Sequence, residues 1–240
     1  MKVTFLHHSS FWIDTGSAYL LFDWYGVPGA EQVENLATRE SDPIFIFCSH
    51  SHGDHYNPGL FELFEGRSVS YLMHEEVHPH VPGKYVERVK FMATGEHIMQ
   101  PLDVKTYGST DEGGSFLIKV PGRKAAEATI FFAGDLNYWH WNEEADEEYL
   151  EDATRKWRTE LHRISEDGVT VDLLFFPTDL RLGRDYLLGL AEFLDHVPTK
   201  FVIPMHINGV ITEKAPLREL CKRAGVELKM PEGPGDSLLF

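Results

Sequence analysis

The sequence predicts an α/β protein in which β-sheets carry helices on their outer faces. Short apolar runs rich in β-branched and aromatic residues fill the chain up to residue 133, with turn-forming residues between them. One long amphipathic segment follows, and the last third alternates strand-like and helix-like segments. This order is typical of sheets with helices packed outside them. No segment has the composition of a linker, so we expect a single domain over residues 1–240.

The first third of the chain predicts an antiparallel meander followed by a buried strand. Strand-like runs with tight spacing lie at residues 3–6, 11–13 and 19–22. Residues 26–42 are rich in Gly, Pro, Glu and Asn and predict a loop. The apolar run at residues 43–48 predicts a buried strand. A short helix is expected over Pro58–Phe64, with Asn57 as its cap.

The rest of the chain predicts more strands, one long helix and an alternating end. Five strands are expected at residues 69–73, 88–91, 104–107, 115–120 and 128–133. The long helix should begin near Asn142, because an apolar stripe runs along one face through Ala145, Tyr149, Ala153, Trp157, Leu161 and Ile164. Strand 171–176, helix 184–196, strand 201–203, helix 213–224 and short strands near Val226 and Leu238 complete the pattern. Thr212 should cap the last helix and Gly225 should end it.

Composition and charge narrow the class of protein. No apolar run approaches the roughly 20 residues that span a bilayer, and the start, Met1–Leu6, does not resemble a secretion signal. Two cysteines are too few for a disulfide framework, which favours the reducing cytoplasm. The net charge of −16, from 22 basic and 38 acidic residues, argues against nucleic acid or an anionic membrane as partner. We therefore expect a cytoplasmic protein with a small-molecule partner.

A dense group of metal-ligand residue types follows the buried strand at residues 43–48. His50, His52, Asp54 and His55 lie within six positions. Neutral imidazole and carboxylate oxygen are the ligands that zinc and similar divalent ions take. Gly53 lacks a Cβ, and we expect a sharp turn there that lets the side chains converge. A set of ordinary capping and turn residues would rarely contain four residues of metal-ligand type in so short a stretch.

Two further ligand types follow strand-like runs later in the chain. Asp135 comes after Gly134 at the end of the run at residues 128–133, and His206 comes after the run at residues 201–203. Either one alone would be unremarkable. In this order, His50-x-His52-x-Asp54-His55, Gly134-Asp135 and His206 resemble the metal-binding signature of the metallo-β-lactamase fold superfamily. The opening meander with its segment Leu6–Phe11 is similar to the start of the ascorbate-6-phosphate lactonase-like branch.

This resemblance covers nearly the whole chain and implies a fold and a set of roles. The implied fold is a four-layer αββα sandwich with the ligands on loops at one edge of the two sheets. His50 and His52 would bind a first metal, Asp54 and His55 a second, Asp135 would bridge both, and His206 would complete the second site. A hydroxide held by the metals would be the nucleophile, and Asp54 would hydrogen-bond it or accept its proton. One or two divalent ions are implied, with zinc expected and manganese or iron as alternatives.

The chain departs from the family pattern at the first metal. The family supplies a further histidine from a segment that corresponds here to Thr106–Gly114, which contains none. Asp111 is a candidate oxygen ligand in its place, and a site with more oxygen ligands would favour manganese or iron over zinc. The alternative is a first site that stays open, binds weakly or is empty.

Four residues are candidates for substrate contact. His140 lies in the aromatic segment Tyr138–Trp141, which either walls the substrate cleft or packs against the long helix. Arg181 could bind an anionic group, although it and Asp179 could equally form a structural ion pair. His8 either lies near the site, as the resemblance implies, or is a core histidine.

The function that these observations predict is metal-dependent hydrolysis of a small ester, lactone or phosphate-bearing substrate. One alternative is a phosphodiesterase or nuclease of the same fold, which the acidic charge disfavours. The other is a non-catalytic member of the fold that binds a small ligand. The missing histidine of the first metal site favours this alternative.

Overall fold

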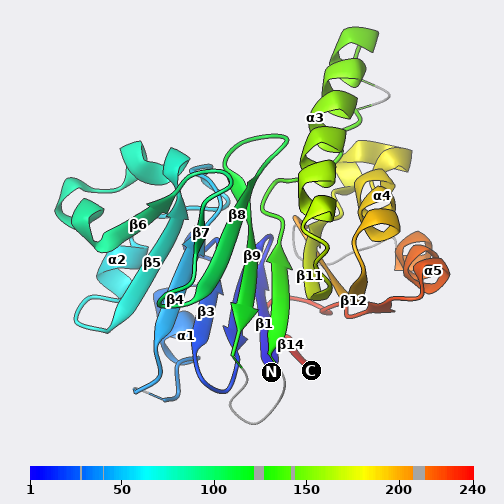
Figure 1. Cartoon of the computed structure of the whole chain (residues 1–240). Helices are drawn as coiled ribbons and strands as arrows, with labels where there is room; N and C mark the ends of the chain where they lie inside the picture. Colours follow the sequence, from blue (N-terminus) through cyan, green and yellow to red (C-terminus); the bar gives the residue numbers. More distant parts are fainter. Residues whose placement is uncertain (28, 40, 122–126, 142–143, 208–213) are drawn as a thin grey trace.

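Two seven-stranded β-sheets form the centre of the molecule (Figure 1). They are built from the residues that the computed structural model describes, 1–27, 29–39, 41–121, 127–141, 144–207 and 214–240. The first sheet has the order β14 (Ser237–Leu239), β1 (Lys2–His7), β2 (Ser10–Asp14), β3 (Tyr19–Phe22), β4 (Ile44–Cys48), β5 (Val69–His74) and β6 (Val89–Met92). The second has the order β13 (Glu227–Leu228), β12 (Thr199–Met205), β11 (Val171–Pro177), β10 (Ala128–Phe132), β9 (Gly114–Val120), β8 (Asp103–Gly108) and β7 (His97–Ile98).

Strand direction within each sheet determines where the strands end. Strands β1, β2 and β3 pair antiparallel in chain order, which confirms the predicted meander. From β3 to β6 every pairing is parallel, and so is every pairing from β10 to β13. The carboxyl ends of parallel strands meet at one edge of a sheet, where loops can converge.

Aromatic side chains fill the space between the two sheets. Phe22 stacks on Phe47 in its own sheet and on Phe132 of the other, with ring centroids 4.8 and 4.5 Å apart. Phe11 contacts Phe175 across the same interface at 4.8 Å. These apolar strand faces are fully buried, and burial of this kind is the main favourable term in folding.

Helices cover the outer faces of both sheets. The first sheet carries α1 (Ala30–Glu34), α2 (Leu60–Leu63) and two 3₁₀ helices, η1 (Glu75–His80) and η2 (Gly83–Arg88). The second carries α3 (Glu147–Glu166), α4 (Leu188–His196) and α5 (Lys214–Ala224), with η3 (Leu180–Asp185) before α4 (Figure 1). Trp157, Leu161 and Ile164 of α3 are buried, as the apolar stripe predicts. The predicted αββα sandwich is therefore confirmed.

Several predicted boundaries are wrong, each for a local reason. The predicted loop at residues 26–42 contains α1, which is held by the fully buried Val33. The helix at Pro58–Phe64 shrinks to α2, and Asn57 Oδ1 accepts from the N–H of Gly59 rather than capping the helix itself. The helix predicted at residues 184–196 starts later, because its first residues belong to η3, which ends at Asp185, and α4 begins at Leu188. Strand β7 and the 3₁₀ helices η1 and η2 were not predicted.

Among the later helices, the predicted start of α3 is wrong and the predicted end of α5 is confirmed. Helix α3 begins at Glu147 with Asp146 as its cap, not near Asn142, which lies outside the described residues together with Thr212. Gly225 ends α5 with φ 71°, as predicted. No helix of the described residues is long and apolar enough to cross a membrane.

Candidate metal centre

The ends of six strands bring the predicted ligands to one edge of the sandwich. His8 follows β1, Asp23 follows β3, the segment Ser49–His55 follows β4, and Asp135 follows β10. Asp179 lies just after β11 and His206 directly after β12. Residues separated by almost 200 positions thus share one site, because the parallel strands all end there.

Asp135 is at the centre of this cluster. Its carboxylate is 4% exposed. One oxygen, Oδ2, lies 3.4 Å from His50 Nε2, and the other, Oδ1, lies 3.2 Å from His55 Nε2 and 3.4 Å from His206 Nε2. Burial raises the pKa of Asp135, but the surrounding histidines outweigh it and hold that pKa well below its usual range. Asp135 is thus an ionised carboxylate shared by three imidazoles, as a bridging ligand would be.

Buried polar atoms that face this centre lack hydrogen-bond partners. They include Nε2 of His50, Nε2 of His55 and Oδ1 of Asp135. An unpaired buried polar atom is costly, and such atoms are rare in folded proteins. A divalent cation would satisfy all of them, since imidazole nitrogen and carboxylate oxygen are its usual ligands. The donor set therefore fits a metal.

Each of these imidazoles is held from behind through its other nitrogen. His55 Nδ1 lies 2.7 Å from Asp23 Oδ2, and His206 Nδ1 lies 2.9 Å from Asp179 Oδ2. His50 Nδ1 lies 2.9 Å from the hydroxyl of Ser49, which donates to Asp23 at 2.6 Å. This pattern places the proton on Nδ1 and leaves Nε2 free to bind metal, the arrangement found around metal-binding histidines.

Comparison with known proteins agrees with this geometry. No family model matches the chain. A curated relative named metal-dependent hydrolase, from Alkaliphilus metalliredigens, is 28% identical over 149 residues, which cover 56% of this chain and 63% of that protein. A second with the same name, from Carboxydothermus hydrogenoformans, is 23% identical over 270 aligned residues that cover both chains completely.

Solved structures identify the fold. A metallo hydrolase from the archaeon Ignicoccus hospitalis superposes with a TM-score of 0.67 at 15% identity, over 100% of this chain and 97% of that one. A metallo-β-lactamase fold protein from Bacillus subtilis superposes with a TM-score of 0.61 at 13% identity, over 99% of both chains. The chain has the metallo-β-lactamase fold. The similarity to the lactonase-like branch stays a prediction, because none of these proteins carries that name.

Within this metallo-β-lactamase fold protein, three residues of the site have strained backbones. His8, Asp23 and His206 have φ angles of 53°, 42° and 60°, and they are the described non-glycine residues with positive φ. Left-handed backbone is uncommon for residues with a Cβ and collects at functional sites. All three side chains belong to the cluster, so the strain marks the same place as the ligand geometry does.

Two glycine turns let the second sheet approach the histidine segment closely. A Cβ on Gly113 would lie 2.0 Å from the Ser49 carbonyl oxygen, and one on Gly134 would lie 2.7 Å from Ser49 Cβ. Both glycines also have positive φ. By contrast, a Cβ on Gly53 would meet nothing within 4 Å, and its φ is not left-handed. The chain turns at Gly53 as predicted, since the N–H groups of His55 and Tyr56 both donate to the His52 carbonyl at 2.9 Å. Gly113 and Gly134 allow the close approach of the second sheet.

The first metal position has three candidate ligands among the described residues, His50, His52 and Asp135. His52 is half-exposed, and its Nε2 lies 3.1 Å from Glu112 Oε2. Asp111 belongs to no ligand group found among the described residues, although burial and the nearby Asp135 raise its pKa. Glu112 is thus the carboxylate in contact with His52, and a ligand role for Asp111 stays a prediction.

The candidate substrate residues lie around the cluster rather than within it. His140 Nδ1 faces Asp185 Oδ2 at 3.0 Å. Arg181 pairs with Asp179, which holds His206, and its guanidinium lies 5.9 Å from the centroid of the Trp141 ring. Asp179 therefore supports a ligand from behind, while the side chain of Arg181 is largely exposed.

The aromatic segment Tyr138–Trp141 packs against the long helix, as predicted, and its predicted contact with substrate stays a prediction. The Tyr138 ring stacks on Trp157 of α3, and its hydroxyl lies 2.6 Å from Thr154 Oγ1. Trp139 donates to the carbonyl of Asp135 at 2.9 Å. Trp141 lines an open cleft of about 480 Å³ together with Glu144, Ala145, Asp146 and Tyr149. Tyr138 thus packs on the helix and Trp141 lines a cleft.

We expect the stability of the metal-free protein to fall as the pH rises from about 6.5 to about 9. Burial lowers the pKa of His206, but the carboxylates of Asp135 and Asp179 outweigh burial and raise it to about 9. The folded-state pKa is above the unfolded value near 6.5, so protonated His206 stabilises the fold at low pH and this contribution is lost through pH 9.

The expected loss in unfolding free energy is at most about 3 kcal/mol. Urea unfolding of chelator-treated protein at pH 6, 7.5 and 9 measures it. His206→Asn, which tolerates the left-handed backbone, should show a weaker pH dependence. Identical pH profiles for the two proteins would contradict the assignment.

Proposed function

We propose that the chain is a metal-dependent hydrolase that acts on a small ester, lactone or phosphate-bearing substrate. The observation that carries this proposal is the convergence of three imidazole Nε2 atoms on the two oxygens of the buried Asp135. The curated relatives with the name metal-dependent hydrolase support it. A divalent metal bound by His50, His52, Asp54, His55, Asp135 and His206 would supply hydrolytic chemistry, because coordination lowers the pKa of water towards neutrality.

Asp54 is the residue that we assign to the reacting water. Its carboxylate is half-exposed at the mouth of the cluster, while the histidines behind it are buried. The adjacent His8 imidazole, whose Nε2 lies 3.3 Å from Asp54 Oδ2, is the main cause that lowers the pKa of Asp54 far below its usual range. A carboxylate that stays ionised accepts a hydrogen bond from a water molecule and orients it, whereas a base that stores a proton needs a pKa nearer neutrality.

Arg181 and the neighbouring cleft would form the substrate-binding part of the site. Arg181 uses one edge of its guanidinium on Asp179, and its side chain is 66% exposed. The free edge would bind an anionic group of the substrate. Trp141 would wall the cleft beside it, and His140 of the same segment would contact the substrate. A cytoplasmic setting would suit the two free cysteines.

Metal content tests this proposal directly. Protein purified without added metal should contain at least one equivalent of zinc, manganese or iron by elemental analysis. Chelation should lower Tm by roughly 5–10 °C, since a ligand at 100 times its Kd stabilises by about 2.7 kcal/mol. It should also abolish hydrolysis within a panel of lactones, esters and phosphodiesters, and added metal should restore the activity. Protein without bound metal whose Tm is unchanged by chelator would refute the proposal.

A further inference from the structure

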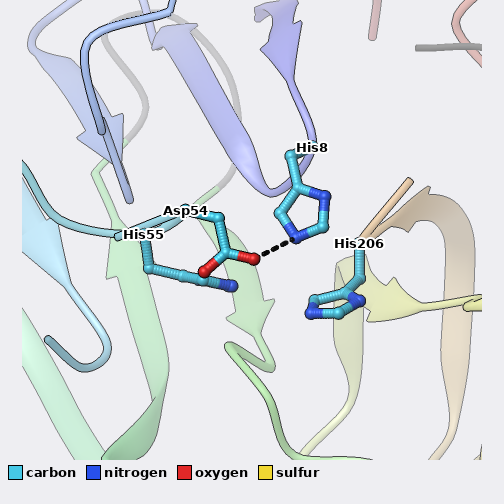
Figure 2. Close-up of side chains that lie close together, drawn as sticks. All are labelled: His8, Asp54, His55 and His206. Atoms are coloured by element: carbon cyan, nitrogen blue, oxygen red, sulfur yellow. Dashed lines mark ion pairs between the residues drawn. The ribbon is translucent and has the colours of Figure 1, made fainter. Parts of the chain in front are cut away.

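The donors around Asp135 divide into two unequal sets. One set, which we call the first position, contains His50, His52 and Asp135. The other, the second position, contains His8, Asp54, His55 and His206, each with a ligand atom within 4.8 Å of the others. Figure 2 shows these four side chains directed toward one another, with His8 arriving from the end of β1 and facing Asp54. The superfamily resemblance implies that His8 lies near the site but does not include it among the metal ligands.

His8 is a buried imidazole without a hydrogen-bond partner. It is 4% exposed, and neither of its ring nitrogens makes a hydrogen bond. Its Nε2 lies 3.3 Å from Asp54 Oδ2, and its ring centroid lies 4.3 Å from that of His206 and 5.4 Å from that of His55. A core histidine would pair at least one nitrogen, so this ring requires a partner that lies within the cluster.

The backbone holds His8 in this orientation at a cost. A register irregularity between Phe5 and His7 precedes it, and His8 itself has φ 53°. Its carbonyl accepts from the N–H of His206 at 3.1 Å, and it forms an isolated β-bridge with Ile207. The two histidines, both with left-handed backbone, are therefore fixed to each other by the main chain, which pre-positions both rings.

The two positions differ in donor number and in burial. The second position has four donors, and Asp135 Oδ1 lies beside two of them, 3.2 Å from His55 Nε2 and 3.4 Å from His206 Nε2. At the first position there are three, and one of them, His52, is half-exposed and in contact with Glu112. More donors held in a buried, preorganised site bind a cation more tightly.

We propose that His8 is a ligand, with Asp54, His55 and His206, of a single tight position for one divalent cation, and that the His50/His52 position binds a second cation more weakly. This inference rests on the proposed metal-dependent function. Three imidazoles with a carboxylate favour zinc, iron(II) or cobalt(II) over magnesium or calcium.

Titration of the metal-free full-length protein with cobalt(II), against a chromophoric chelator, tests the order of affinities. The native protein should bind one equivalent tightly and a second at least tenfold more weakly. His8→Asn should weaken the tight class 10- to 100-fold or more, because loss even of an indirect partner costs that much. Asparagine is chosen because it tolerates the left-handed backbone of residue 8. His97→Asn is the control, since the His97 ring pairs with Asp103 at the surface, away from the cluster; it should leave both classes unchanged.

A second measurement separates a ligand from a residue that only positions Asp54. Protein with one equivalent of cobalt(II) should show three paramagnetically shifted, exchangeable imidazole N–H resonances, from His8, His55 and His206. His8→Asn should show two. The count in the native protein needs no variant, so misfolding of the variant would not obscure the answer.

Different results would overturn the role of His8 and the hydrolase proposal. Two shifted N–H resonances in the native protein, or an unchanged tight class in His8→Asn, would overturn the role of His8 while leaving the hydrolase proposal intact. Native protein that binds no cobalt at all would overturn both proposals.

Discussion

Asp135→Asn is expected to remove bound metal and hydrolytic activity together. The carboxylate is buried, and both of its oxygens face histidine Nε2 atoms. The amide has no negative charge to offset a divalent cation, and its NH₂ group would point at the nitrogen of a metal-binding imidazole. The loss in metal affinity should exceed the roughly 10- to 100-fold that removing an indirect partner costs.

The measurement is metal content and chelator-competition affinity, followed by activity on whichever substrate the panel identifies. Asp172→Asn is the matched control. Asp172 lies on β11, next to β10, and accepts from Thr129 at 2.8 Å at the opposite end of these strands. The control should keep its metal and its activity. Asp135→Asn protein with normal metal content would show that the cluster is not the metal site.

The sequence predicts the positions of the ligands because each follows an apolar strand. The runs that become β4, β10 and β12 are buried and strongly apolar, so their ends are easy to locate. All three lie within the parallel parts of the sheets, and this geometry brings His50, Asp135 and His206 together without any further signal in the chain.

The residues that hold the ligands from behind are harder to predict. Asp23 also follows a strand, and that position was the available signal, but its partners Ser49 and His55 lie 26 and 32 residues away. The left-handed backbone of Asp23 is set by tertiary contacts and has no sequence signature. Glu112 rather than Asp111 meets His52 because of how the turn before Gly113 is folded, and single-residue placement in a turn is not encoded by composition.

Short elements such as α1 escape prediction from the sequence for a different reason. Helix α1 has five residues, and a segment of that length has no stable helical state of its own. It forms because Val33 packs against the outer face of the first sheet. Such packing cannot be deduced before the sheet is known, so residues 26–42 could be predicted only as a loop.

Asp23→Asn is expected to weaken metal binding at both positions while leaving the fold in place. Asp23 is fully buried, accepts from His55 at 2.7 Å, and accepts from the Ser49 hydroxyl that in turn lies against His50. One carboxylate thereby sets the proton position of two imidazoles. Its Oδ1 also accepts from the Ser49 N–H at 2.8 Å.

The amide of asparagine can satisfy only part of this network. If its oxygen keeps the Ser49 N–H, its NH₂ group faces the His55 Nδ1 proton and drives that proton to Nε2, where it blocks metal binding. We expect metal affinity to fall roughly 10- to 100-fold and the unfolding free energy to fall by about 1–3 kcal/mol. Asparagine also accepts the positive φ of residue 23, so backbone strain is not added.

Competition titration with cobalt(II) and urea unfolding of the metal-free protein measure the two effects. Asp103→Asn is the matched control, because His97 Nε2 and Asp103 Oδ1 lie at the same 2.7 Å separation but at the surface, away from the cluster. Exposed ion pairs of this kind contribute little to stability. The control should therefore change neither the metal affinity nor the unfolding free energy by much. Equal effects of the two substitutions would mean that the Asp23–His55 pair has no special influence on the metal. A loss confined to Asp23→Asn would establish that metal affinity depends on the buried carboxylate of Asp23.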